Sequence, residues 1–570
     1  MKKYILILIL LAASFLRLWK ISYVPVSLFG DEVDLGYQAY SVLKTGKDYY
    51  GNFMPIHFHS LAEWRTPLYL YSAVPTVAIF GVSPLGVRLP AAIFGILGVW
   101  ILYILIKEIS KNENLGLVSA ALLAISPWHI QYSRAGFEVT LLLLLLLLGL
   151  LFFFKSLTKG KFLWLSVLFL ALTPWVYSTA KLFTPILMFF LLIAHWKNIF
   201  SLSKKNLISA LIALLVVGGP IVWGTLFGGG SQRFDYIGIF TDPTMESEVG
   251  TARLNDARAR GETGSGLNPT LIDRVIHNKF TFVGNNLLRN YLKPFSFDFL
   301  FNNGDPNPRH SIHEMGEFYK IEAIALIVGL VLFFAHSASS GQNAKIKWLM
   351  AFWILAGVIP ASLTRDGGNH ATRLILILPP LIFLISFGWL EIFGLISRKY
   401  RLILLGMVTF LYFLCIFSYL HNYWVHNPTY SERWWHYGFK EGITFIKENQ
   451  KDYDKVVITT AGEPPWIFFA GFYEYDPSLW QKNFPIGNDV EVPGIGKVSH
   501  IDKFYFGSPS GGVYDWGRAV DAKTLYLATA KEVNVNLILE PERTPGNLTL
   551  LKAIPYPSGE PAFYLFTGKK

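Results

Sequence analysis

VTLLLLLLLLGLLFFF, at residues 139–154, is an apolar run that leads directly into the basic segment KSLTKGK at residues 155–161. Such a run is long enough to cross the roughly 30 Å hydrocarbon layer of a membrane as a helix. Comparable runs recur from the N-terminus to about residue 420. The sequence therefore predicts an integral membrane protein that crosses the bilayer many times.

The composition of the whole chain agrees with this prediction. Of its 570 residues, 52% are hydrophobic and only 16% are charged, and the mean hydropathy is +0.39. A soluble protein of this length needs more polar surface. The net charge of +11 is spread through short loops between the apolar runs. This spread is typical of membrane topology, so we expect no nucleic-acid partner. The single cysteine, Cys415, lies in an apolar run, which excludes a disulfide framework and a cysteine metal site.

The loops between the runs alternate between short basic segments and longer, more varied ones. The basic set comprises Lys2 and Lys3, 107–111, 155–161, 197–205, 345–347 and 398–401. Lys and Arg accumulate in cytoplasmic loops, so the set predicts a cytoplasmic N-terminus. Eleven spans are expected, near 4–19, 89–106, 116–132, 139–154, 162–177, 182–196, 207–224, 321–336, 346–363, 372–395 and 402–419. An odd number places the C-terminus outside, in a multi-pass protein of the plasma (inner) membrane.

Two apolar segments could be interpreted in more than one way. Residues 67–82 contain Pro75 and would form a helix of only about 24 Å. A span there would move every later basic loop outside, so we expect an amphipathic helix in the outer interface. Met1–Trp19 begins like a signal peptide but lacks a small-residue cleavage site, which favours a retained first span.

Residues 421–570 differ from the rest, with mixed charge and many Pro and Gly residues. They show a helix-like stretch to Lys447, a strand-like stretch at 455–460 and apolar runs at 524–529, 535–540 and 562–566. This pattern predicts a small α/β domain. We therefore expect a transmembrane domain at 1–420, with outer loops at 20–88 and 225–320, followed by an extracytoplasmic α/β domain at 421–570.

Two adjacent carboxylates begin a helix-like stretch in the first outer loop, Asp31 and Glu32. Carboxylates beside the membrane suit general-base work on a hydroxyl group. The alternative is that Asp31 only caps the helix, because acids favour helix N-termini.

Several cations fall in the outer loops, where the positive-inside rule depletes them. They are Arg65, Arg88, Arg134, Lys181, Arg309, Arg365 and Arg373. Arg suits phosphate because its planar group donates two parallel hydrogen bonds, so the set could form a phosphate cradle. Each could instead extend to the interface by itself. Glu138 lies one helical turn after Arg134, where an ion pair between the two is the alternative role.

The long outer loop closes with the polar stretch at 302–314, which contains Asp305, Arg309, His310, His313 and Glu314. His310, His313 and Glu314 could hold a divalent metal, whereas a turn-rich lid is the alternative. No other cofactor is indicated. The chain lacks a phosphate-binding P-loop and a dinucleotide glycine pattern, which fits a substrate delivered through the membrane.

An ordered set of motifs over about the first 420 residues resembles a known family. The set comprises Asp31-Glu32, Arg65-Thr66-Pro67-Leu68-Tyr69, Phe80-Gly81-Val82-Ser83, Arg88-Leu89-Pro90, Ser133-Arg134-Ala135 with Glu138, 177–185, His370-Ala371-Thr372-Arg373 and Pro379-Pro380. It resembles the C-type (GT-C) membrane glycosyltransferases, in particular the protein O-mannosyltransferase and lipid A aminoarabinose transferase group, which is similar to glycosyltransferase family 39. The resemblance implies transfer of a sugar from a polyprenyl-phosphate carrier to a hydroxyl of a glycan, lipid or protein acceptor on the outer face.

The resemblance also implies roles for single residues. Asp31 would be the general base and Glu32 its support. Arg88, Arg134 and Arg373 would contact the carrier phosphate, with Lys181 and Arg65 as further candidates. The chain departs from the family at Glu138, where Asp is common, and shows no β-trefoil insertion in the long loop. The class of the acceptor therefore stays open among glycan, lipid and protein.

The expected chemistry is direct displacement. Fixed guanidinium groups would stabilise charge on the leaving phosphate, while the base takes a proton from a hydroxyl on the opposite face of the sugar, which predicts inversion. The alternatives are an oligosaccharide transferase or polymer ligase, a lipid-linked sugar transporter, and a binding protein without activity. The expected span interiors contain almost no ionisable residues and no repeat is visible, which disfavours a transporter.

Overall fold

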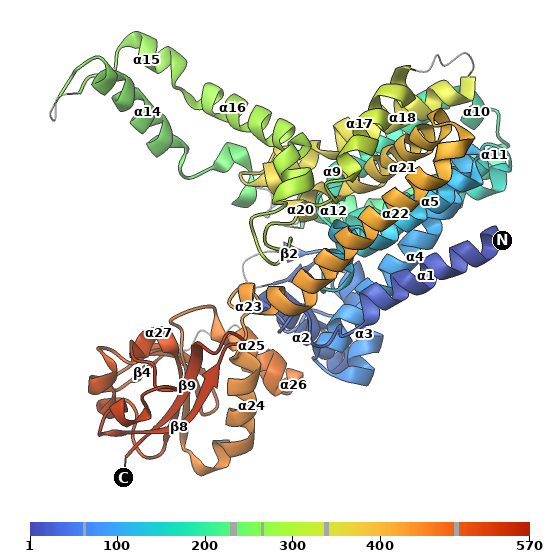
Figure 1. The fold of residues 1–570 in the computed structure, drawn as a ribbon. Coiled ribbons are helices and arrows are strands. Elements are labelled where there is room, and N and C mark those ends of the chain that lie inside the picture. The colour runs from blue at the N-terminus through green and yellow to red at the C-terminus, as the bar shows by residue number, and fades with distance from the viewer. Residues whose placement is uncertain (61–63, 229–235, 264–266, 336–340, 484–488, 570) are drawn as a thin grey trace.

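The computed structural model describes residues 1–60, 64–228, 236–263, 267–335, 341–483 and 489–569. A bundle of long helices is followed by a C-terminal domain built around a sheet (Figure 1). The first half contains α1 (Lys2–Leu18), α2 (Gly30–Thr45), α3 (Leu68–Phe80), α4 (Pro84–Ser110), α5 (Glu113–Ile125), α6 (Pro127–Ser133), α7 (Val139–Ser156), α8 (Leu163–Leu172), α9 (Ala180–Ala194), α10 (Trp196–Phe200), α11 (Lys204–Ala213) and α12 (Gly219–Phe227). The second half of the bundle contains α14 (Met245–Ala259), α15 (Leu271–Ile276), α16 (Lys279–Leu292), α17 (Glu322–Ala335), α18 (Gly341–Gly357), α19 (Ile359–Ser362), α20 (Ala371–Leu374), α21 (Leu378–Leu395), α22 (Arg398–His421) and α23 (Asn427–Tyr430).

Helix lengths support a multi-pass membrane protein. In the described part of the chain, six helical segments are long and apolar enough to cross a membrane: Pro84–Ser110, Val139–Ser156, Lys204–Phe227, Ala344–Ser362, Ala371–Leu395 and Arg398–Tyr430. Shorter apolar helices occupy Leu68–Phe80, Glu113–Ile125, Gly160–Trp175, Ala180–Ala194 and Glu322–Ala335. The predicted helical membrane fold is confirmed, whereas the number of eleven spans, their orientation and the boundary at residue 421 remain predictions.

One expected span is broken in the structure. The segment predicted as a single helix at 116–132 forms α5 and α6, which meet at Ser126. The Ser126 hydroxyl accepts a hydrogen bond from the His129 backbone N–H, and Pro127 begins the second helix. Ser followed by Pro is a favourable helix start, so the break has a local cause.

The helices differ in how deeply they are buried. The polyleucine helix α7 runs through the bundle with 83% of its residues buried. By contrast, only 11% of the most apolar 18 residues are buried in the segment Arg398–Tyr430, and 17% in the segment Lys204–Phe227. An apolar helix that leaves most of its surface uncovered faces lipid.

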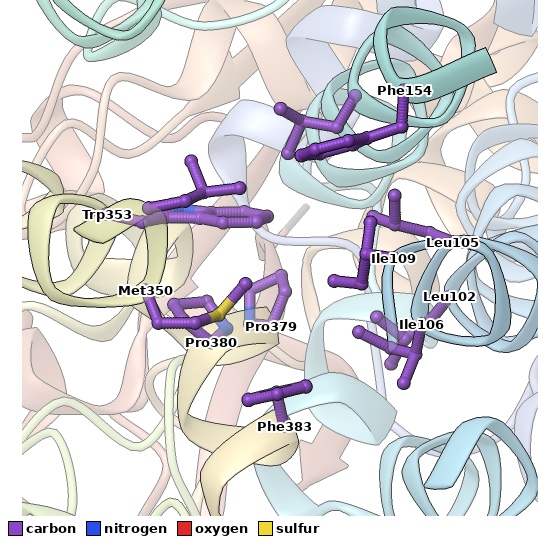
Figure 2. A pocket seen from close by; sticks show the side chains of 12 residues that line it. Leu102, Leu105, Ile106, Ile109, Phe154, Met350, Trp353, Pro379, Pro380 and Phe383 are labelled. Carbon is purple, nitrogen blue, oxygen red and sulfur yellow. The ribbon is translucent and has the colours of Figure 1, made fainter. Parts of the chain in front are cut away.

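Small residues bring α17 and α21 into close contact. A Cβ atom added to Gly329 would lie 2.0 Å from the Leu384 carbonyl oxygen, and one added to Gly388 would lie 1.9 Å from that of Ala325. Such backbone contact between membrane helices requires glycine at both crossing points. Packing is similarly tight around Met350, Trp353 and Pro379, which border an apolar cavity of about 10 Å³ between α18, α21, α4 and α7 (Figure 2). A gap of this size holds no substrate.

The apolar segment at 67–82 forms α3, with Pro75 inside the helix. It packs against α2 and α4, and the Tyr69 hydroxyl donates to the Val87 carbonyl oxygen at 3.0 Å. Ile79 and Phe80, at the C-terminal end of the helix, remain exposed. The proposed interfacial position of this helix stays a prediction.

The C-terminal domain is a mixed α/β domain, as predicted. Its helices are α24 (Phe439–Asn449), α25 (Pro465–Tyr473), α26 (Pro477–Asn483) and α27 (Ala530–Val533), and its strands are β3 (Lys455–Ile458), β4 (Val490–Val492), β5 (Gly496–Ile501), β6 (Phe504–Phe506), β7 (Thr524–Thr529), β8 (Leu548–Pro555) and β9 (Pro561–Gly568). The sheet order is β4-β5-β6-β3-β7-β9-β8, and β3 runs parallel to both of its neighbours. Residues 535–540, expected as an apolar element, contain a turn instead, while strands β4, β5, β6 and β8 were not predicted.

The sheet domain is docked on α2. The Tyr37 hydroxyl donates to the Tyr475 carbonyl oxygen at 3.0 Å, and the Gln481 amide donates to the Ser41 hydroxyl at 3.0 Å. A Cβ atom added to Gly471 would lie 2.3 Å from Val33 Cγ1, so α25 touches α2 directly. Figure 1 shows α25 and α26 beside α2. The helix that begins with the predicted acidic pair is therefore held between both parts of the molecule.

Candidate active site

Helix α2 begins at Gly30 and carries three acids in its first turns, Asp31, Glu32 and Asp34. Successive residues of a helix point in different directions, so adjacent acids meet different surroundings. The Asp31 side chain is 50% exposed, whereas the side chains of Glu32 and Asp34 are 0% and 1% exposed. Asp31 is thus the carboxylate of this group that solvent or substrate can reach.

Glu32 forms a buried ion pair with Arg88 of α4. Both carboxylate oxygens accept from the guanidinium group, at 2.7 Å each, and the Gly136 backbone N–H donates to Glu32 Oε1 at 2.7 Å. The remaining Arg88 donors bind the backbone carbonyl oxygens of Ile21, Pro25 and Ser27. All five N–H donors of Arg88 are therefore used, and none is left for a phosphate in this conformation.

Arg134 is also fully buried and contacts backbone rather than acids. Its guanidinium group donates to the carbonyl oxygens of Leu16 at 2.8 Å and Val24 at 3.0 Å, and lies over the Tyr423 ring. Together with Arg88 it fixes the segment that leads into α2. This burial is at odds with the phosphate contact expected for Arg134. The alternative role was an ion pair with Glu138, but the Arg134 guanidinium binds backbone carbonyl oxygens instead.

Asp34 was not predicted as a site residue. Its carboxylate accepts hydrogen bonds from the Tyr49 hydroxyl at 2.8 Å and the Ser60 hydroxyl at 2.7 Å. Arg65 Nε lies 3.8 Å away, and the same guanidinium group contacts Asp31 Oδ1 at 2.6 Å. Arg65 therefore links the buried acid to the exposed one. An acid three residues after Asp31, on the same helix face, is the sequence signal that would have indicated this role.

The pKa of Asp34 predicts a pH-dependent stability. Burial raises this pKa from 3.8 to about 6, although Arg65, Ser60 and Tyr49 oppose the shift and Asp31 adds to it. Because the folded-state pKa is the higher one, the group favours folding below pH 3.8, and this contribution is lost as the pH rises through 6. The free energy of unfolding of the wild type, minus that of Asp34→Asn, should fall by roughly 2–3 kcal/mol between pH 4 and pH 7.

Unfolding in detergent at several pH values measures this difference. Asp515→Asn, at an exposed aspartate, is the matched control and should show a much smaller change. A difference for Asp34 that stays flat or grows with pH would contradict the assignment.

Residues of the C-terminal domain reach the start of α2. The Gly30 backbone N–H donates to His436 Nδ1 at 3.2 Å, and His436 Nε2 lies 3.4 Å from Glu463 Oε1. With Nδ1 as acceptor, a neutral His436 carries its proton on Nε2 and donates to Glu463. This contact lowers the pKa of the half-exposed Glu463 carboxyl, and the charges of Arg309 and Asp31 also act on it. Neither residue was predicted, because their approach to Asp31 depends on domain docking.

Arg309 lies in the region of His436 and Glu463 and is half-buried. Its guanidinium group lies 5.0 Å from the ring of Phe29 and 5.8 Å from that of Trp434. In the part of the chain that the structure describes, no carboxylate lies within ion-pair distance of Arg309. Its charge acts on Glu463 together with that of Asp31. Arg309 is thus a cation beside the exposed acid with capacity for an anionic ligand.

The possible metal ligands differ from the expected set. Asp305, His310 and His370 offer ligand atoms that lie within 4.8 Å of one another. His313 and Glu314 are exposed, and the His313 ring lies 5.5 Å from that of Tyr430. The local composition of the loop pointed to His313 and Glu314, whereas folding brings in His370 from the segment before α20. Burial raises the pKa of Asp305 to about 7, and it lowers the pKa of His310.

The other predicted residues lie around this region in separate contacts. Arg373 donates to the Thr364 hydroxyl at 2.8 Å and to Asp366. Lys181 Nζ lies 3.4 Å from His57 Nε2, and Glu138 is half-buried at the start of α7. The structure therefore brings Asp31, Arg65 and Arg309 into one region and gives the other cations different partners.

A comparison with known protein families supports the resemblance seen in the sequence. The model of the family described as dolichyl-phosphate-mannose-protein mannosyltransferase matches residues 65–223. The resemblance is confirmed. The match contains α3, α4 and α7, and with them Arg65, Arg88 and Arg134. No curated protein matches the chain.

Several solved structures are similar to this chain at low identity. The oligosaccharyltransferase of Archaeoglobus fulgidus, tethered to an acceptor peptide, has 13% identity and a TM-score of 0.49, over 83% of this chain and 63% of that one. ArnT of Cupriavidus metallidurans, bound to undecaprenyl phosphate, has 10% identity and a TM-score of 0.42, over 98% of this chain and 97% of that one. The protein O-mannosyltransferase Pmt1–Pmt2 complex of S. cerevisiae has 17% identity and a TM-score of 0.31, over 41% and 34%. The chain thus spans less than two thirds of the length of the archaeal enzyme.

Proposed function

We propose that this chain is an inverting glycosyltransferase that moves a sugar from a polyprenyl-phosphate donor to an acceptor hydroxyl on the outer face of the membrane. The observation that carries the proposal is the exposed Asp31 carboxylate at the start of α2, with the guanidinium groups of Arg65 and Arg309 nearby. The family match over residues 65–223 supports it. The N-terminus is then cytoplasmic, and the C-terminal domain lies outside.

Each part of the site has a distinct task. Asp31 takes the proton from the acceptor hydroxyl as this oxygen bonds to the anomeric carbon. The bond to the carrier phosphate breaks at the same carbon, and the phosphate leaves with the electron pair. Arg309 stabilises the charge that builds on the phosphate, and Arg65 holds the Asp31 carboxylate in position through their ion pair. Both groups are fixed before the reaction and need not reorganise. Attack and departure on opposite faces of the sugar give inversion.

Glu32 and Arg88 are positioning residues in this proposal. Both are buried, and their hydrogen bonds hold the segment at 21–27 and the first turn of α2 in place. Arg134 does the same for the end of α1. This revises the roles implied by resemblance, in which Arg88 and Arg134 contact phosphate. Lys181 and Arg373 stay candidates for that contact.

The apolar tail of the donor has a matching cavity. A cavity of about 870 Å³ lies between α7, α8, α9 and the α11–α12 segment, and its lining is almost entirely apolar. Exposed side chains such as Trp223 and Phe227 border it, so it opens toward lipid. Gly224 of α12 touches His57, which neighbours Lys181, so the outer part of α12 meets a cationic group. We assign this cavity to the carrier chain.

Incubation with radiolabelled polyprenyl-phosphate sugars tests the proposal. The purified, reconstituted protein should move label from the carrier lipid into a glycan, lipid or protein fraction. Fractionation of the products also separates single-sugar transfer from transfer of a whole oligosaccharide. Label that never leaves any carrier lipid tested would contradict the proposal.

Arg309→Gln should lower kcat/KM for the donor by about 10²-fold, because it removes a fixed cation from the leaving phosphate. Arg309→Lys keeps the charge but loses the planar pair of donors, so it should recover only part of the activity. Steady-state kinetics with varied donor measure both effects. Arg543→Gln, at an exposed arginine of the C-terminal domain, is the control. Wild-type kinetics in Arg309→Gln would exclude Arg309 from donor binding.

We also propose that Asp305, His310 and His370 hold a divalent cation. Two imidazole rings and a carboxylate are suitable ligands for Zn²⁺ and similar ions. The backbone N–H groups of Asn307 and Ala371 donate to the two Asp305 oxygens at 2.9 and 2.8 Å, which orients this carboxylate. A bound cation would fix the loop at 305–310 against α20, next to Arg309.

His370→Ala should lose the metal that the wild type retains after gel filtration, because one of three protein ligands is removed. Elemental analysis and calorimetric titration of stripped protein with Zn²⁺ measure the stoichiometry. His313→Ala is the matched control, since this exposed histidine lies outside the group, and should bind as the wild type does. Equal loss in both variants, or no metal in the wild type, would overturn the assignment.

A further inference from the structure

Helices α14, α15 and α16 form an arm that projects sideways from the helix bundle (Figure 1). Ion pairs join α14 to the other two helices. Arg260 donates to both Asp273 oxygens at 2.7 Å, and Lys279 Nζ lies 3.0 Å from Glu246 Oε1. Val249 of α14 is buried in the arm. The arm is therefore a folded unit with two different outer sides.

One side of the arm is apolar and uncovered. Its exposed residues, with their exposed fractions, are Leu271 (79%), Ile272 (68%), Val275 (64%), Ile276 (52%), Phe280 (89%), Leu288 (59%) and Leu292 (56%), all from α15 and α16. The opposite side, on α14, exposes polar residues such as Glu248 and Asn255. Seven exposed large apolar side chains on two neighbouring short segments are typical of an interaction site.

The segment that carries the exposed apolar residues also carries exposed basic residues. Residues 271–293 carry four basic side chains, Arg274, Lys279, Arg289 and Lys293, and all four are exposed. Their single acid, Asp273, is buried and paired with Arg260. A helix with apolar and basic residues together suits the interface of a membrane that contains anionic lipid. The same basic charge disfavours contact with a second copy of this surface.

The root of the arm lies where lipid-facing helices end. The Asn290 side-chain amide donates to the Thr364 carbonyl oxygen at 2.7 Å, and the Tyr291 hydroxyl donates to that of Leu355 at 3.1 Å. The short helix η4 (Ile239–Thr241), which follows α12 in the chain, packs on α16. Phe227 at the end of α12 is 71% exposed. The arm is thus attached beside helices that leave apolar side chains exposed.

We propose that the arm docks on the outer leaflet of the membrane through the apolar side of α15 and α16, and that its basic residues favour anionic lipid there. The outer leaflet is the one on the side of Thr364 and of the candidate site. Docking of the arm requires no catalytic activity, so this inference stands apart from the proposed function.

Spin labels on the full-length protein in nanodiscs test the docking. Single cysteines are introduced at Val275 and Phe280 on the apolar side, and at Glu248 and Asn255 on the polar side, with Cys415→Ser as background. All four positions are at the surface or exposed, so labels there leave the arm intact. In nanodiscs of phosphatidylcholine with phosphatidylglycerol, oxygen should broaden the spectra of the labels at 275 and 280. A water-soluble nickel chelate should not broaden them. Labels at 248 and 255 should show the reverse.

Two results would overturn the proposal. Nickel broadening at 275 and 280 equal to that at 248 would show that the apolar side faces water. Shielding of these positions from both reagents would show that protein covers them, either a partner or a second copy. The lipid preference is tested by Arg289→Gln, at an exposed basic residue of α16, and by nanodiscs of phosphatidylcholine alone, both of which should increase nickel broadening at 280. Unchanged broadening in both would refute the role of anionic lipid.

Discussion

Asp31→Asn should reduce sugar transfer by about 10²–10⁴-fold, because asparagine cannot accept the proton of the acceptor hydroxyl. Asn has the same shape, so binding of the donor should persist and the loss should appear in kcat. The Asp31 side chain is half exposed, and the buried guanidinium group of Arg65 still has Asp34 3.8 Å away when Asp31 loses its charge, so the Tm should change little. Release of label from a polyprenyl-phosphate sugar measures the rate.

Two controls make this result specific. Asp489→Asn, at an exposed aspartate of the sheet domain, should retain full activity. A thermal unfolding curve of Asp31→Asn separates loss of chemistry from loss of fold. Transfer at the wild-type rate in a folded Asp31→Asn protein would remove this residue as the base.

Arg88→Gln should destabilise the protein by about 3–5 kcal/mol, since it leaves the Glu32 carboxylate buried without its partner. Glu32 and Arg88 are both completely buried, and Arg88 also binds the carbonyl oxygens of Pro25 and Ser27. The same substitution should lower transfer by displacing the start of α2. Unfolding in detergent, followed by tryptophan fluorescence, measures the change in stability.

The double variant Glu32→Gln, Arg88→Gln tests the origin of this loss. Removal of both charges should recover part of the stability, because no unpaired charge remains. Arg433→Gln breaks the exposed pair with Glu560 and should cost less than about 1 kcal/mol. If Arg88→Gln were no worse than Arg433→Gln, the ion pair would not hold the segment before α2.

Patterns in the sequence predicted those features that depend on local chemistry. Apolar length predicted the membrane helices, and residue composition predicted the α/β domain, because both signals lie within single segments. The pair Asp31 and Glu32 was found as a functional candidate for the same reason. Even the break at Ser126 had a local signal, Ser followed by Pro, which span length alone concealed.

Partners of individual side chains were not predictable in this way. Arg88 and Arg134 stood out as outer-loop cations, but they bind carbonyl oxygens, which every residue possesses and no sequence pattern marks. His370 joins Asp305 and His310 only through the packing of α20 against the long loop. His436 and Glu463 reach Gly30 and Asp31 only through domain docking. Long-range assembly therefore decides which of the predicted residues work together.

The contact between His436 and the Gly30 backbone N–H ties the start of α2 to a residue made much later in translation. A nascent chain that has inserted its helices, but has not yet folded the sheet domain, has no imidazole at the start of α2 and no Gln481 against Ser41. The proposed reactive centre is unfinished at that stage. Under the proposed function, activity therefore begins only after the sheet domain has folded against α2.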